Sequence, residues 1–107
     1  MSCTENKALS NAISVKFVKF GGVVRVNHLD RRSWASVTFS GARHHLRITL
    51  EGVGAAGAGA DFLEELADMD LSVPGHIVAD VVLLAEGRSD DGRYASLELE
   101  ALTIEDA

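Results

Sequence analysis

The segment Leu50–Asp61, LEGVGAAGAGAD, separates two parts of the chain that differ in the spacing of their hydrophobic residues. Before the segment, residues 42–50 alternate between apolar and polar side chains, which is typical of a strand with one buried face. After it, Phe62, Leu66 and Met69 recur at the spacing of one helical face. The segment therefore joins a sheet to a helix, and its glycines are the first candidates for a binding loop.

Four strands are expected before this segment. Residues 13–20 are rich in β-branched and aromatic side chains, and Gly21 and Gly22 separate them from residues 23–26, which predicts a hairpin. A polar corner over residues 30–33 leads into a third strand over residues 34–39. The fourth strand, residues 42–50, is expected to place on its buried face His44, Leu46, Ile48 and Leu50.

One helix and two more strands are expected after the segment. Asp61 and Glu64 have the spacing of a capping box, so the helix should begin at Asp61 and end near Asp70, ahead of Pro74. The apolar run over residues 76–86 predicts a strand that is buried on both faces at the centre of the sheet.

The last expected strand covers residues 94–104. Its apolar residues change parity after Leu99, so we expect a β-bulge near Ala101 that keeps both sets in the core. Glu98 and Glu100 then face away from the core. There they would oppose basic side chains of the fourth strand, namely Arg43, His45 and Arg47.

These elements predict an α+β fold with the order β-β-β-β-α-β-β. Short connections between strands favour antiparallel neighbours, so we expect a twisted, mostly antiparallel sheet of about six strands with one helix packed on it. A partly closed β-barrel capped by the helix is the alternative. Residues 1–12 are expected to form a flexible N-terminal leader, and residues 13–107 a single domain.

Composition and charge limit the partners. No apolar run approaches the roughly 20 residues of a membrane helix, and the N-terminus does not have the pattern of a signal peptide, so we expect a soluble cytoplasmic protein without a membrane partner. The net charge of −6 argues against nucleic acid as a partner. The charge is unevenly distributed, because the basic side chains are concentrated in residues 1–50 and the acidic ones in residues 51–107. Cross-strand ion pairs within one sheet are the favoured interpretation.

Gly52, Gly54 and Gly57 have the spacing G-x-G-x-x-G of dinucleotide-binding loops. Such a loop needs a buried parallel strand before it and a helix N-terminus that receives the phosphates. Here the preceding strand alternates in polarity, and the acidic Asp61 at the expected helix start would repel a phosphate. We therefore expect no cofactor, and a mobile loop over residues 52–60 in which Gly54 and Gly57 contact a ligand.

Residues 70–75, DLSVPG, have the pattern D-x-S-x-x-G. This pattern resembles one of the two motifs of PilZ domains, small β-barrels that bind cyclic di-GMP. The resemblance implies nucleotide sensing with arginines of an R-x-x-x-R motif, for which this chain offers Arg31 and Arg32 at a different spacing. The favoured interpretation is that Asp70 and Ser72 end the helix and begin a turn.

The residues with catalytic or metal-binding chemistry show no recognised spacing. Cys3 has no partner in the chain, and no serine lies in a G-x-S-x-G motif. A metal site would require His28 or His44 to lie near His76, so we expect no metal. Asp80, within the predicted central strand, is expected to be paired, for example with Arg25.

We therefore predict a small non-enzymatic module that binds a partner protein or a small ligand. The reason is geometric, because one short helix cannot cover a sheet of about six strands. A second copy of the chain would cover the remainder through a sheet edge or an apolar sheet face. The alternative is an anion- or nucleotide-sensing domain, and a small enzyme that uses the histidines and Asp80 is less favoured. The basic residues available to an anionic ligand are Arg25, Arg31, Arg32, Arg43 and Arg47.

Overall fold

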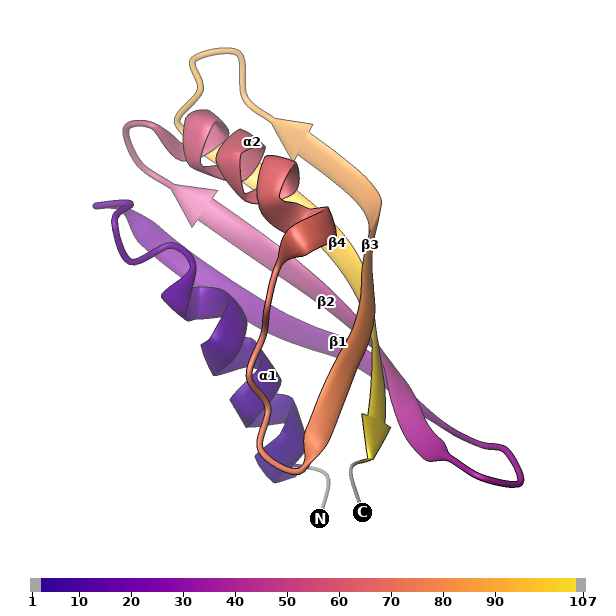
Figure 1. The fold of residues 1–107 in the computed structure, drawn as a ribbon. Coiled ribbons are helices and arrows are strands. Elements are labelled where there is room, and N and C mark those ends of the chain that lie inside the picture. The colour runs from indigo at the N-terminus through magenta and orange to yellow at the C-terminus, as the bar shows by residue number, and fades with distance from the viewer. Residues whose placement is uncertain (1–2, 106–107) are drawn as a thin grey trace.

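A computed structural model describes residues 3–105 as two helices packed on one face of a four-stranded antiparallel sheet (Figure 1). The spatial order of the strands is β1-β2-β4-β3, so β1 and β3 are the sheet edges. The predicted α+β class and antiparallel sheet are confirmed, whereas the expected six strands and single helix are wrong. The elements are α1 (Cys3–Val15), β1 (Val23–Ala35), β2 (Ser40–Glu51), α2 (Ala55–Glu65), the 3₁₀ turn η1 (Leu66–Asp68), β3 (His76–Arg88) and β4 (Tyr94–Glu105).

The first helix replaces the strand predicted over residues 13–20. Leu9 and Ile13 are completely buried and Phe17 is nearly so, and their spacing of four places them on one side of α1 and the turn that follows. Burial of this apolar face against β1 and β2 therefore outweighs the β-propensity of the segment. Most of the residues expected as a leader also lie in α1, and Gly21 and Gly22 connect α1 to β1 instead of forming a hairpin turn.

Strand β1 is longer than predicted and runs through the expected corner. Residues 30–33 stay paired with β2, and a register shift between His28 and Asp30 leaves Leu29 as the extra residue. The separate strand predicted over 34–39 is therefore wrong. The reversal occurs at Ser36 and Phe39, where the Ser36 N–H donates to the Phe39 carbonyl over 2.7 Å.

Helix α2 begins six residues earlier than predicted, so the capping box at Asp61 is wrong. Gly54, with φ of 86°, supplies the left-handed conformation immediately before Ala55. Gly59 is buried, and a Cβ on it would lie 3.6 Å from the Ala95 Cβ of β4. Small residues thus let the helix lie close to the sheet. The predicted mobile loop is reduced to residues 52–54, since the rest of the glycine segment is helical.

Strand β3 is found where predicted along the chain, but it lies at the edge of the sheet and not at its centre. Asp80 is consequently exposed, and no ion pair with Arg25 forms among the described residues. The bulge predicted at Ala101 is also wrong. Strand β4 is regular and buries Ala101, whereas the register shifts lie in β3, at Ala79 and Leu84.

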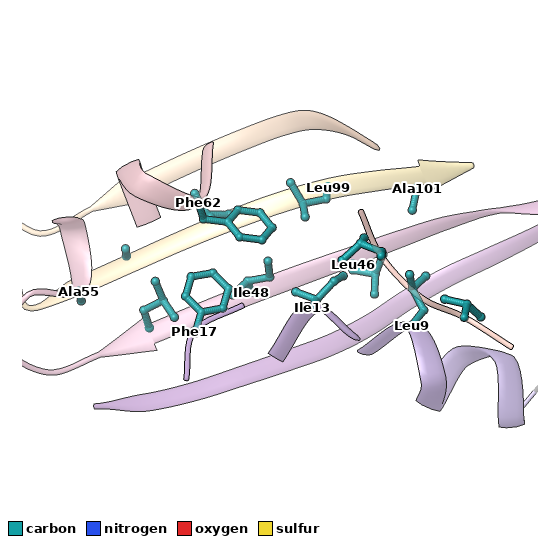
Figure 2. Packing of buried hydrophobic residues seen from close by; sticks show 14 residues of the cluster. Leu9, Ile13, Phe17, Leu46, Ile48, Ala55, Phe62, Leu99 and Ala101 are labelled. Atoms are coloured by element: carbon teal, nitrogen blue, oxygen red, sulfur yellow. The ribbon is translucent and has the colours of Figure 1, made fainter. Parts of the chain in front are cut away.

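The core lies between the helices and the inner face of the sheet (Figure 2). Phe17 and Phe62 stack with ring centroids 4.9 Å apart and join the turn after α1 to α2. Side chains of β2 and β4 complete the layer, including Leu46, Ile48 and Leu99. Strands β1 and β3 are not paired with each other in the described structure, so the alternative of a partly closed barrel is wrong.

Candidate functional site

The open face of the sheet, on the side away from the helices, carries cross-strand ion pairs. Arg47 lies 2.6 Å from Glu98, Arg43 lies 3.3 Å from Glu100, and Arg25 lies 3.9 Å from Glu51. The prediction that Glu98 and Glu100 oppose the basic residues of the neighbouring strand is confirmed. Exposed pairs of this kind contribute little stability, about 0–1 kcal/mol each. These cross-strand pairs involve three of the five candidate arginines, and the other two also lie near carboxylates.

The remaining candidate arginines point in different directions. Arg32 is exposed and lies 3.4 Å from Asp30 of the same strand. Arg31, the adjacent residue, points to the helix-covered face and reaches Glu5 of α1 at 2.9 Å. The five arginines therefore do not converge on one anion site in the described structure.

A buried polar cluster around Glu5 is the densest group of ionisable side chains in the described part of the chain. One carboxylate oxygen, Oε1, accepts a hydrogen bond from Arg31 at 2.9 Å. The other, Oε2, accepts from His44 Nε2 at 2.7 Å and from the Thr103 hydroxyl at 3.1 Å. His76 Nε2 lies 3.6 Å from Oε1. Glu5 thus connects α1 to β1, β2 and β4, and lies beside the start of β3.

The cluster continues through two histidines. His28 Nε2 and His44 Nδ1 are 2.8 Å apart, and the rings are nearly perpendicular. Because the Glu5 carboxylate can only accept, His44 Nε2 carries a hydrogen, and a neutral His44 then accepts from His28 through Nδ1. The pair can hold one additional proton but not two, since two imidazolium rings would direct N–H groups at each other. The hydrogen-bond chain is therefore complete only while at least one ring is neutral.

The electrostatics of the cluster favour an ionised Glu5 and neutral rings at His28 and His44. Burial raises the pKa of Glu5, but hydrogen bonds from Arg31, His44 and Thr103 outweigh it and leave the pKa below its ordinary value. Burial is the main cause that lowers the pKa of His44 and of His28. For His44 the hydrogen bond to Glu5 acts in the opposite direction and is weaker than the effect of burial.

The cluster does not have the arrangement of a metal centre. Glu5 contacts His44 and His76, and His44 in turn contacts His28, an arrangement that the sequence could not establish. Their nitrogen and oxygen atoms are directed at one another, however, and no group of three such side chains among the described residues is arranged to hold a metal ion. Sequence reasoning missed Glu5 because it lay in the expected leader. Glu5, Leu9 and Ile13 follow one another at intervals of four residues, and this helical spacing was the signal that Glu5 lies on the buried side of a helix.

An open groove of about 620 Å³ lies between the turn after α1 and the exposed side of α2. Gly54 and Gly57, two of the predicted ligand residues, line it, whereas none of the predicted arginines does. Four large apolar side chains also contribute to its lining: Phe17, Phe20, Phe62 and Met69. Lys16 and Lys19 border it on the side of the turn, and Asp61 and Glu65 on the side of α2.

The segment with the D-x-S-x-x-G pattern connects η1 to β3. Leu71 and Val73 are buried, and Val73 forms an isolated bridge with His76, while Asp70 and Ser72 are exposed. The described residues form an open sheet, so the β-barrel implied by the PilZ resemblance is absent. The expectation that Asp70 and Ser72 end the helix is wrong, because α2 ends at Glu65 and η1 at Asp68, and the turn lies at Pro74 and Gly75.

The edge strand β3 is the most apolar exposed element of the sheet. Every residue from Val82 to Arg88 is exposed, including Leu84 at 51% and Val82 at 39%. Strand β1, at the other edge, carries charged side chains at Arg25, Asp30 and Arg32.

Comparison with known protein families gives no match, and a search of curated proteins finds no similar sequence. No helix in residues 3–105 is long and apolar enough to cross a membrane.

Proposed function

We propose that this protein is a non-enzymatic interaction module that binds an extended segment of a partner protein by strand addition to β3. The observation that supports the proposal is the exposed, apolar edge of β3, which has no strand partner on its outer side among residues 3–105. An edge strand offers a row of free backbone donors and acceptors, and soluble proteins normally protect such edges with charged side chains. Residues 81–85 of β3, VVLLA, carry no charge at all.

The bulges of β3 do not remove this site. They interrupt the pairing with β4 at Ala79 and Leu84, and the stretch between them remains in register with β4. Leu84, the extra residue of the second bulge, has an exposed side chain. A strand added at this edge would cover Leu84 and its neighbours, which removes apolar surface from water while the backbone groups gain partners.

Charge at the two ends of the apolar stretch defines the chemistry of the partner. Asp80 precedes the stretch and Glu86 follows it, and both are exposed. The complementary segment is an extended chain with an apolar centre of about five residues and lysine or arginine at its flanks. An anion-binding role receives less support, because Arg25, Arg43 and Arg47 are already paired with carboxylates.

Fluorescence anisotropy with a synthetic strand tests the proposal. The probe is a labelled peptide of alternating valine and threonine between terminal lysines, and the same peptide with terminal glutamates serves as its charge control. We expect the lysine peptide to bind more tightly. Leu84→Lys and Val82→Lys should each raise its dissociation constant at least about tenfold, because a lysine there opposes both burial and the basic flank.

The matched control is Val23→Lys, which places a lysine at an exposed position of the other edge strand. It should bind the peptide like the unchanged protein. Equal binding by the Leu84, Val82 and Val23 variants, or no binding of either peptide, would exclude β3 as the recognition site. Thermal melts of all variants separate a loss of binding from a loss of folding.

A further inference from the structure

The groove beside α2, lined by the residues of the turn after α1 and by one side of the helix, has apolar side chains exposed at its borders. Val18 is 80% exposed on the turn, and Val53 is 77% exposed just before α2. Phe62 and Met69 lie deeper in the groove. This surface is separate from β3, because none of its lining residues belongs to that strand.

The two sides of the groove carry opposite charge. Lys16 and Lys19 provide the basic side, and Asp61 and Glu65 the acidic side. None of these four side chains forms an ion pair within residues 3–105, in contrast to the arginines of the open sheet face. A surface with one basic and one acidic side is complementary to a copy of itself turned by a two-fold rotation, because each basic side then faces an acidic side.

The shape of α2 suits a close approach of two backbones. Gly57 and Ala60 are exposed on the helix, and a Cβ on Gly57 would meet no atom within 4 Å. The first turns of α2 therefore form a narrow ridge beside the groove. Such a ridge can enter the groove of a second copy, as small residues allow at close helix contacts.

We infer that the groove is the contact surface of a symmetric dimer. In this dimer, the α2 ridge of each copy enters the groove of the other, and Lys16 and Lys19 of each copy face Asp61 and Glu65 of its partner. Val18 and Val53 become buried at the contact. The dimer is independent of strand addition at β3, so each surface can be tested while the other is intact.

Charge reversal provides the test, with sedimentation equilibrium as the readout. The unchanged protein is expected to dimerise. The basic-side variant Lys16→Glu/Lys19→Glu and the acidic-side variant Asp61→Lys/Glu65→Lys should each raise the dimer dissociation constant about 100-fold or more, because like charges then face each other. An equimolar mixture of the two variants should restore a heterodimer, since every facing pair is again opposite in charge.

Matched controls place the same charge changes outside the groove. Glu64→Lys on α2 and Lys7→Glu on α1 should leave the dimer intact, as should Leu84→Lys on β3. A strictly monomeric unchanged protein would overturn the inference. A dimer that persists in both charge-reversal variants would also overturn it. So would loss of the dimer in both variants without a heterodimer in their mixture, provided that circular dichroism shows both variants to be folded.

Discussion

Removal of the Glu5 carboxylate is expected to destabilise the protein more than any exposed substitution on either helix. Glu5→Ala leaves Arg31, His44 and Thr103 without their shared acceptor, and His44 is completely buried. Breaking a buried ion pair from one side costs about 3–5 kcal/mol. Arg31 retains some access to solvent, so we expect the lower end, about 3 kcal/mol.

This loss corresponds to a fall in the melting temperature of about 10–20 °C for a domain of this size. Urea unfolding followed by circular dichroism measures the change in free energy. Glu5→Gln keeps the shape and one acceptor oxygen and should lose less. Lys7→Ala, at an exposed position of the same helix, should change the free energy by no more than about 0.5 kcal/mol.

A double-mutant cycle identifies the source of the effect. If the hydrogen bond from His44 matters, Glu5→Ala and His44→Ala together should cost clearly less than the sum of the single losses, with a coupling of about 1 kcal/mol or more. A loss below about 1 kcal/mol for Glu5→Ala, or additive effects within about 0.3 kcal/mol, would show that the cluster does not hold α1 on the sheet.

Three further outcomes follow from the structure. Burial lowers the pKa of His28 and His44 below their ordinary value of 6.5, so the unfolded chain binds protons at these histidines more readily than the folded protein. The free energy of unfolding should therefore fall as the pH drops below about 6.5. Urea unfolding midpoints at about pH 7.5 and about pH 5.5 measure this change. The decrease should be smaller in His28→Gln. In the monomer, Gly57→Ala should stabilise by about 0.5–1 kcal/mol because Gly57 is an open helical position, whereas Gly54→Ala should destabilise because its φ is 86°. Thermal melts of the two variants at protein concentrations below the dimer dissociation constant check the opposite signs. Leu99→Ala should cost about 2–5 kcal/mol in urea unfolding because Leu99 is completely buried.

The sequence predicts the elements whose pattern has only one interpretation. Strand β2 alternates between residues of opposite polarity, and its buried face contains the expected residues His44, Leu46, Ile48 and Leu50. The opposition of Arg47 and Glu98 follows from the same alternation. These predictions succeed because one face of the strand is buried and the other is exposed, and an alternation of apolar and polar residues indicates such a strand.

The errors occur where one pattern fits two structures. Residues 13–20 contain β-branched and aromatic side chains, but Leu9, Ile13 and Phe17 also have helical spacing, and the tertiary contacts select the helix. The early start of α2 was hidden because glycine is a poor helix former in isolation, and packing of Gly59 close to β4 compensates for it. The apolar run of β3 predicts burial on both faces but belongs to an exposed edge.

The positions of the candidate site residues were also predictable only in part. Sequence reasoning identified Gly54 and Gly57, and both line the groove. It placed them in a mobile loop, however, whereas most of that segment belongs to α2. It listed five arginines as candidates for an anionic ligand, whereas the sheet distributes them over both faces and each lies near a carboxylate. Glu5 was missed because a buried polar cluster depends on residues far apart in the chain, such as Glu5 and Thr103, and no local pattern reports their meeting.

Amide hydrogen exchange along β3 shows whether an added strand pairs with this edge. The protein should be measured alone and with an excess of the lysine-flanked valine–threonine peptide. Strand addition predicts that amides within residues 80–88 that exchange rapidly in the free protein become protected by the peptide, while β1 amides are unchanged. Protection that appears only in β1 or α2, or no protection at a concentration where the peptide is bound, would contradict the assignment of β3 as the recognition edge.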